Sequence, residues 1–186
     1  MSKPSTTTKS KPRWLGRLSR DERGVSAVEF ALLAPLMIGL YLGCAEISDG
    51  VAADRKVSLT AAAVANLTSQ VTNITSSDMT NILDASSAII VPYSAANLKI
   101  TVSCLNIDAN QNVTVKWTAT RNGGVGTSTS VPSALKVANS QLILSEVSYS
   151  YTPTVGYTIT GTLTLSDHMF MSPRISAPTY NSVACT

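Results

Sequence analysis

The chain is poor in the side chains that most often bind metals or perform acid–base catalysis. It has one histidine, His168, among 186 residues, and none of its three cysteines stands at zinc-ligand spacing from it. It also lacks a glycine-rich phosphate loop, a paired acid and base, and a complete set of nucleophile motifs. We therefore predict no enzyme, no catalytic residue, no metal, no cofactor and no small-molecule substrate. We interpret His168 as a structural side chain.

Charge is also scarce, and it is unevenly distributed. Charged residues make up 13% of the chain and apolar residues 44%, which argues against an intrinsically disordered protein. The net charge of +3 comes from the first 24 residues, which hold seven basic and two acidic side chains. The other residues carry a net charge of −2, so the body of the protein gives no reason to expect a nucleic-acid partner.

A long apolar run follows this basic segment. Residues 25–45 comprise 21 positions with one charged side chain, Glu29. At about 1.5 Å of rise per helical residue, the run would cross the roughly 30 Å hydrocarbon core of a bilayer. The basic residues before it predict, by the positive-inside rule, a cytoplasmic N-terminus and an exported C-terminal part.

Several interpretations of this run compete. A cleavable secretory signal would have an unusually long basic region, and no clean cleavage site follows. A lipoprotein signal would use Cys44, but bulky Tyr41 stands where a small branched aliphatic residue is usual. Neither explains Glu29, whose carboxylate is costly to bury in a membrane and needs a partner. An uncut signal anchor with an incidental Glu29 is also open.

A cut after Gly24 would supply that partner. It would make Val25 the new N-terminus and place its ammonium within about one helical turn of the Glu29 carboxylate. Gly24, with Glu29 five residues later and Phe30 directly after it, resembles the processing motif of type IV prepilins. The resemblance implies that a membrane-embedded prepilin peptidase removes a basic leader, residues 1–24, on the cytoplasmic side.

The segment is similar, in more detail, to the TadE-like minor pseudopilins of tight-adherence (Tad/Flp) pilus systems. The likeness lies in residues 20–46, RDERGVSAVEFALLAPLMIGLYLGCAE, which end on a second glutamate. It implies a pilus-assembly subunit of the bacterial inner membrane, with a periplasmic head and with inner-membrane lipid, pilin and other pseudopilin subunits as partners. The residues given roles by the resemblance are Gly24 and Val25 in processing, and Glu29, Phe30 and Pro35 in assembly. A proline at position 35 would also kink a helix for purely local reasons.

Beyond the membrane segment the helical period continues. An apolar stripe at spacings of three and four predicts an amphipathic spine helix; its members are Val57, Ala61, Val64, Leu67 and Val71. A second, shorter helix is predicted from Asp78 to Ala88, capped by Ser77 and ended by Pro92.

From Leu98 onward the period changes to two, which is typical of half-buried strands. We predict strands over residues 98–104, 113–119 and 142–151, with a turn at 108–112 and a Gly/Ser/Thr-rich loop at 122–133. A fourth strand is marked on one face by Ile159, Leu163 and Leu165, and on the other by Thr158, Thr160, Thr162 and Thr164.

The cysteines agree with this topology. Cys44 lies at the outer membrane edge, whereas Cys104 and Cys185 fall in the exported part, where disulfides persist. A Cys104–Cys185 bridge would close a loop of about 80 residues and stabilise the head by up to roughly 4 kcal/mol in the chain-entropy model. It would also hold a proline-rich C-terminal tail that has little else to hold it. Two free thiols are the alternative.

Together these patterns predict an α+β fold of pilin-like architecture, with a long N-terminal transmembrane and spine helix before a small antiparallel sheet. The expected divisions are a leader at 1–24, a membrane helix at 25–45, a periplasmic spine with a short second helix at 46–92, and a β head at 93–186. The main rival is a signal-anchored periplasmic binding or adhesion module that is not processed and whose threonine-rich sheet face contacts a ligand.

Overall fold

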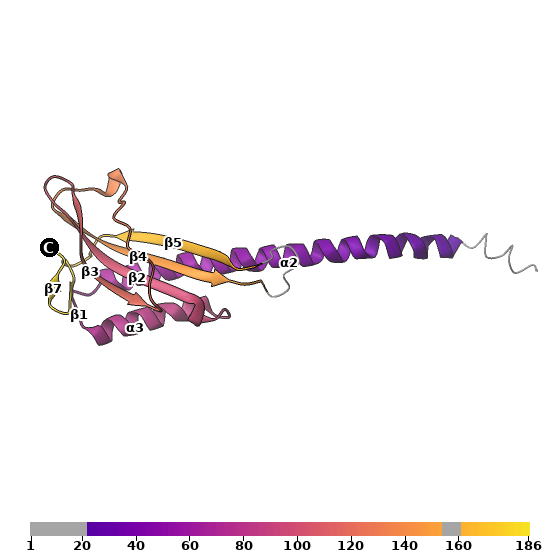
Figure 1. Cartoon of the computed structure of the whole chain (residues 1–186), viewed down its shortest axis with the longest axis horizontal. Coiled ribbons are helices and arrows are strands. Elements are labelled where there is room, and N and C mark those ends of the chain that lie inside the picture. Colours follow the sequence, from indigo (N-terminus) through magenta and orange to yellow (C-terminus); the bar gives the residue numbers. More distant parts are fainter. Residues whose placement is uncertain (1–21, 154–160) are drawn as a thin grey trace, which may run out of the picture. The chain divides into compact units, whose positions relative to one another are not determined.

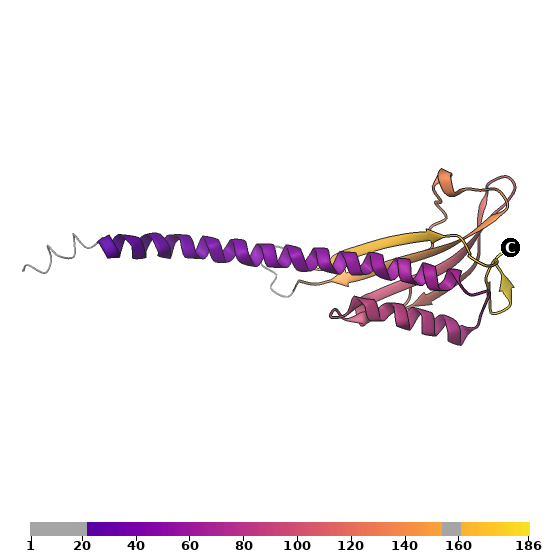
Figure 2. The same cartoon turned by 180° about the vertical axis from the view of Figure 1, so that it is seen from behind.

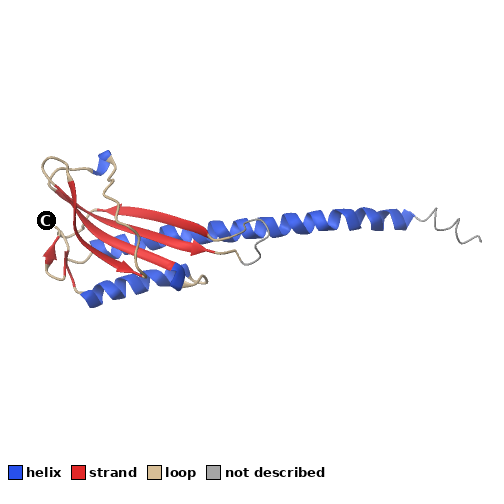
Figure 3. Ribbon diagram, in the orientation of Figure 1, coloured by secondary structure: helices blue, strands red, loops and turns tan. Residues whose placement is uncertain are grey.

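The computed structural model describes residues 22–153 and 161–186 of the chain, coloured along the sequence in Figure 1 and by secondary structure in Figure 3. The helices are α2 (Glu22–Ser69) and α3 (Ser76–Ser87), with short 3-10 turns η1 (Ala88–Ile90), η2 (Ala95–Asn97) and η3 (Ser133–Leu135). The strands are β1 (Asn73–Ile74), β2 (Leu98–Ile107), β3 (Val113–Arg121), β4 (Ser140–Tyr151), β5 (Leu163–Met171), β6 (Thr179–Tyr180) and β7 (Val183–Ala184). The predicted α+β class, with a long apolar helix before an antiparallel sheet, is confirmed.

The chain divides into two compact units, Met1–Cys44 and Ala45–Thr186. In the first unit the described residues are all helical and belong to α2. Most of the large apolar side chains from Val25 to Tyr41 are more than half exposed. Among the described residues, α2 is the one helix that is long and apolar enough to cross a membrane, and none of its most apolar stretch is buried within the chain.

The second unit is built on a four-stranded antiparallel sheet. The strand order is β3-β2-β4-β5, so β2 and β4 are central, and β2 pairs along its whole length with Ser140 to Tyr149 of β4. The part of α2 from Ala45 onward and α3 cover one face, which Figure 2 shows toward the viewer. The main core lies between them and joins Val57, Ala61 and Met79 of the helices to Ile100 and Val147 of the central strands.

The apolar stripe of the spine is confirmed at Val57, Ala61 and Val64, which are fully buried, but it is wrong at Leu67. Leu67 is 36% exposed, and Thr68 takes the buried position instead. The reason is the helical period of about 3.6 residues, which brings position 68 rather than 67 under position 64. A polar residue is tolerated in the stripe at Thr60 too, because its hydroxyl donates to the Lys56 carbonyl at 2.8 Å.

The start of α3 is also corrected. The helix begins at Ser76, and its cap is Thr75 rather than Ser77. The Thr75 hydroxyl accepts from the Asp78 N–H at 3.2 Å, while the Asp78 carboxylate accepts from the Thr75 N–H at 3.1 Å. Such a reciprocal capping box needs an acceptor side chain three residues after the cap, and Thr75 has Asp78 there. Ser77 has only Thr80 at that position.

The predicted β2–β3 hairpin is present, and Asp108 orders its turn. The Asp108 Oδ1 atom accepts from the N–H groups of Asn110 and Asn112, each at 2.8 Å. The hairpin has an irregularity in its register between Cys104 and Leu105, where one residue of β3 is left without a partner.

The sheet is buried on its second face as well, so the expectation that β2 is only half-buried is wrong. A smaller core, formed by Leu105, Ile107, Val131, Leu142 and Leu144, lies on this face. The connection from Asn122 to Asn139 covers part of it. Thr101 on β2 exchanges hydrogen bonds with Val125, accepting from its N–H at 2.6 Å and donating to its carbonyl at 2.7 Å. A Cβ on Gly124 would lie only 2.7 Å from the Thr101 hydroxyl oxygen, so the approach requires glycine.

The fourth strand is β5, and it extends further toward the C-terminus than the period-two pattern indicates. Leu163 lies opposite Tyr151 and Met171 opposite Ile143. The predicted members Ile159, Thr158 and Thr160 lie outside the described residues. Thr162 and Thr164 are exposed, as the alternation predicts for the polar face.

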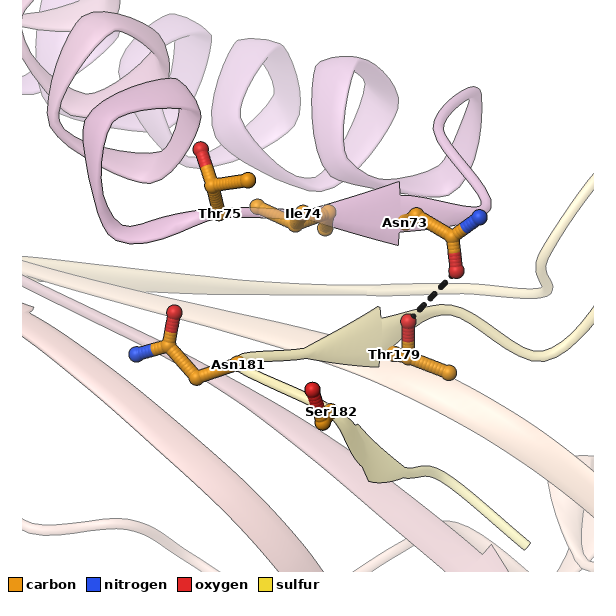
Figure 4. A pocket seen from close by; sticks show the side chains of 6 residues that line it. All are labelled: Asn73, Ile74, Thr75, Thr179, Asn181 and Ser182. Carbon is orange, nitrogen blue, oxygen red and sulfur yellow. Dashed lines mark hydrogen bonds between the residues drawn. The ribbon is translucent and has the colours of Figure 1, made fainter.

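The C-terminal tail forms a second, three-stranded sheet of order β1-β6-β7, in which β1 and β6 are parallel. The N–H of Thr179 donates to Thr72 at 2.8 Å, and the N–H of Asn181 donates to Ile74 at 3.1 Å. Figure 4 shows the shallow cleft of about 460 Å³ at this sheet, where the Thr179 hydroxyl donates to Asn73 Oδ1 at 2.8 Å. The prediction that little besides a disulfide holds the tail is therefore wrong.

Candidate functional site

Gly24 and Val25 lie in α2, near the first residues that the structure describes. Glycine has no Cβ and leaves the backbone more freedom than other residues do. Both residues are exposed, and a Cβ on Gly24 would contact nothing within 4 Å. The peptide bond between them is thus accessible within the described part of the chain.

Glu29 stands four residues after Val25 on the same helix. Residues at this spacing share a helix face, with Cβ atoms about 5–6 Å apart. The structure therefore puts the Glu29 carboxylate one turn above the backbone nitrogen that a cut after Gly24 would free. Glu29 is exposed between apolar neighbours, Val28 at 61% and Phe30 at 72%.

Phe30 and Pro35 complete the predicted N-terminal site. Phe30 follows Glu29 directly and presents its ring outward from the chain. Pro35 lies inside α2, where it cannot donate the backbone hydrogen bond of that position. Both are exposed within this chain, so neither has a packing role in the first unit. They differ in this from Val57 and Ala61 of the same helix.

Cys104 and Cys185 are joined as a disulfide, with Cα atoms 5.8 Å apart. Both are fully buried. Two contacts of Trp117 on β3 lie beside the bridge: its indole N–H donates to the Pro178 carbonyl at 3.2 Å, and its ring lies 5.5 Å from that of Tyr180. Cys44 is exposed and free.

A cluster of tyrosines, Tyr93, Tyr149 and Tyr151, lies at the end of the second unit where α2 enters it. The Tyr93 ring is 6.3 Å from that of Tyr149 and 6.0 Å from that of Tyr151, and its hydroxyl donates to the Asp49 carbonyl at 3.0 Å. Burial, with a smaller contribution from the Asp49 carboxylate, raises the pKa of Tyr93 and of Tyr151. Glu46 is only 4% exposed. The strand period indicates Tyr149 and Tyr151, but nothing in the sequence pattern indicates that Tyr93 joins them.

Glu146 on β4 lies opposite His168 on β5, and both line a cleft of about 160 Å³. The Ser128 N–H lies 3.1 and 3.2 Å from the two Glu146 carboxylate oxygens and so ties the 122–139 connection to the sheet. Burial raises the pKa of Glu146, although the Ser128 bond and the charge of His168 oppose the shift. No sequence pattern indicates this contact, because it joins a loop to a strand 18 residues away.

No group of three or more His, Cys, Asp or Glu side chains able to hold a metal ion occurs among the described residues. The Glu146 cleft offers two carboxylates, those of Glu146 and Asp167, each of which already accepts from a backbone N–H, beside one imidazole. At the Figure 4 cleft, Thr179 and Asn73 hydrogen-bond to each other, and the Asn181 amide donates to the Ser76 hydroxyl outside the cleft at 2.8 Å.

Comparison with known proteins gives one match. No curated protein and no solved structure matches the chain. The family model described as TadE-like protein matches residues 24–66. The match begins at Gly24, contains Glu29, Phe30 and Pro35, and ends three residues before the end of α2. The match confirms the resemblance to TadE-like proteins over residues 24–66, and that family implies a subunit associated with Tad pili.

Proposed function

We propose that the protein is a minor pseudopilin of a bacterial Tad/Flp pilus, cleaved after Gly24 by a prepilin peptidase and assembled through its N-terminal helix. The observation that carries the proposal is the start of the TadE-like match at Gly24, the residue at which the motif predicts the cut. The basic leader lies outside the match, and the apolar helix lies within it.

The place of the scissile bond supports processing. The Gly24–Val25 bond joins two exposed residues, and a Cβ on Gly24 would contact nothing within 4 Å. Gly24 adds backbone freedom and presents no side chain to the peptidase.

The position of Glu29 supports a role in assembly. After the cut, the Val25 ammonium and the Glu29 carboxylate lie one turn apart on the same or a neighbouring subunit. Each charge alone would be costly in hydrocarbon, and pairing removes most of that cost. A pair that requires a defined axial position also fixes the register between neighbouring helices.

The charge distribution supports the orientation. The leader carries a net charge of +5 and directs the N-terminus to the cytoplasm, while residues 25–45 span the membrane. The product would be a periplasmic subunit whose side chains carry a net charge of −2. The orientation signal would therefore leave the molecule when it is cut.

N-terminal sequencing of the membrane-extracted protein tests the proposal. We expect Val25 at the terminus, and the intact chain in a matched strain that lacks the prepilin peptidase. Met1 or Ser2 in both strains would instead support the unprocessed signal anchor. Cys44 at the terminus would support a lipoprotein.

A further inference from the structure

One end of the second unit combines tyrosines with exposed apolar side chains. Tyr93 and Tyr151 pack against each other there, beside Asp49 and Gly50 of α2. Three large apolar side chains around them are exposed: Ile47 at 53%, Val91 at 63% and Leu163 at 43%. We name these three residues the apolar rim.

The members of the apolar rim come from three separate elements that end at the same place. Ile47 lies one helical turn before Gly50, whose Cβ position is 3.9 Å from the Tyr151 ring. Leu163 begins β5 and pairs with Tyr151 at the end of β4. Val91 follows η1 and is two residues from Tyr93. Figure 1 shows β4 and α3 ending at this same end of the second unit.

The chain itself puts this end close to the membrane. Residues 25–45 are the proposed membrane span, and Ile47 follows its last residue by two positions. At about 1.5 Å per helical residue, Ile47 to Gly50 lie roughly 3–8 Å beyond the hydrocarbon. The headgroup region of a bilayer leaflet is about 5–8 Å deep, so these residues fall within it.

We propose that the apolar rim and its tyrosines rest in the headgroup region of the bilayer that α2 crosses. Tyrosine is enriched at this depth because its ring is apolar and its hydroxyl is polar. Exposed apolar side chains that would be unfavourable in water are stabilised at the boundary of the acyl chains. The proposal rests on the membrane span of the proposed function and adds a second contact between the subunit and lipid.

The charges favour an uncharged lipid surface. The charged side chains that flank Ile47 along α2 are Glu46 and Asp49, both acidic, while the Lys56 ammonium donates to the Ile89 carbonyl at 3.2 Å, near Val91. The apolar rim itself carries no charge, and this end therefore has no excess of positive charge. Attraction to anionic lipid therefore does not drive the contact, and we expect it to be nearly independent of salt. The appropriate probe is a nanodisc of zwitterionic phosphatidylcholine and phosphatidylethanolamine.

The chain provides matched controls at the opposite end of the sheet. Val137 is 61% exposed, a fraction similar to that of Val91. Leu135 is 38% exposed, a fraction similar to that of Leu163. Both precede Ser140, where β4 begins, and β4 runs 12 residues from there to Tyr151. At about 3.3 Å per residue, the controls lie some 35–40 Å from the apolar rim along that strand.

The test uses the full chain with Cys44→Ser, so that one new cysteine at a time can carry a fluorophore. Labels are placed at Val91, Leu163, Val137, Leu135 and, within the span, at Leu36. Lipids carrying a nitroxide at the headgroup should quench the labels at Val91 and Leu163 at least twofold more than those at Val137 and Leu135. The difference should persist when salt is raised. Lipids with a nitroxide deep in the acyl chain should quench the label at Leu36.

The outcomes separate this inference from the proposed function. Quenching of Leu36 with equal, weak quenching at all four other positions would overturn the headgroup contact and leave the membrane span intact. Absence of quenching at Leu36 would overturn the span and the inference with it. A third outcome is that headgroup nitroxides do not quench the labels at Val91 and Leu163, and that these labels are shielded from solvent only in discs that hold two copies of the chain. That outcome would assign the apolar rim to a contact between subunits and overturn the lipid contact.

Discussion

Cys185, the next-to-last residue, is bonded to Cys104 on β2, a sequence separation of 81 residues. The bridge fastens the small β1-β6-β7 sheet to the main core, in which both cysteines are fully buried. Because Trp117 also holds the tail through the Pro178 carbonyl, the tail has covalent and noncovalent attachments at one place.

We predict that this bridge forms in the exported protein. Replacing both Cys104 and Cys185 by serine should lower the free energy of unfolding by up to about 4 kcal/mol, since the unfolded chain regains the entropy of an open loop. Denaturant unfolding without reductant measures the change. Cys44→Ser is the matched control and should leave stability unchanged, because Cys44 is exposed and free. Non-reducing mass spectrometry that finds Cys185 unpaired in exported protein would refute the bridge.

The cap of α3 gives a second prediction. Thr75→Ala should lower the free energy of unfolding by about 1 kcal/mol, because it removes the acceptor for the Asp78 N–H. Ser77→Ala is the matched control, two residues away on the same exposed turn, and should cost only a few tenths of a kcal/mol. Thermal unfolding of the two variants gives the comparison. Equal losses would show that Thr75 is not the cap.

The sequence predicted those features that repeat a local period. Alternation located β2, β3, β4 and the first residues of β5, and spacings of three and four located the spine, because burial on one face imposes these periods directly. The assignment of Leu67 to the stripe is wrong because two successive steps of three residues, from Ala61 to Leu67, drift away from the true helical face. Thr75 was missed because Ser77 is an equally good cap by residue type, and only the reciprocal bond with Asp78 decides between them.

Contacts between distant segments were beyond such reasoning. Thr101 and Val125, or Ser128 and Glu146, meet because a long connection folds back over the sheet. No local period records that choice. The N-terminal site is the opposite case, since Gly24 to Phe30 lie within two helical turns. Its residues could be named from the sequence, whereas the three elements that form the apolar rim could not.

Glu146 makes stability depend on pH. Burial raises its pKa above the ordinary 4.5 in the folded protein, so the folded state binds this proton more tightly than the unfolded state. The resulting stabilisation is complete below 4.5 and is lost as pH rises through the raised pKa. Glu146→Gln keeps an oxygen for the Ser128 N–H but cannot titrate. We expect a flatter dependence of unfolding free energy on pH for this variant.

Denaturant unfolding at a series of pH values measures that slope. His168 lies opposite Glu146 in the strand pair. Glu146→Gln is therefore compared with the parent both as a single variant and in a protein that also carries His168→Gln. Asp54→Asn, which removes an exposed carboxylate from α2, is the control and should leave the slope as in the parent. If Glu146→Gln has the parent slope between about pH 4 and 7, Glu146 does not titrate with a raised pKa.

Gly24 controls processing in the proposed function. Gly24→Trp should leave the leader attached, since a bulky side chain would occupy the position next to the scissile bond. The readout is the mass of the membrane-extracted chain, with at least about a tenfold loss of the cleaved form expected, equivalent to 1.4 kcal/mol or more in the transition state. Gly39→Trp, in the same helix but outside the motif, is the matched control and should be cleaved normally. Unchanged cleavage of Gly24→Trp would remove the assignment to a prepilin peptidase.

Glu29 is predicted to act after cleavage rather than in it. Glu29→Gln should be cut as in the parent but should reduce assembled pili about tenfold or more, because the Val25 ammonium is then left in hydrocarbon without a counter-charge. Glu29→Asp retains the negative charge on a side chain that is one methylene shorter. It should therefore assemble more pili than Glu29→Gln does. Counting pili by electron microscopy, alongside the mass of the processed chain, separates the two steps. Because Gln matches Glu in size and hydrogen-bonding reach, pili at the parent level would mean that the carboxylate charge does not set the register between subunits.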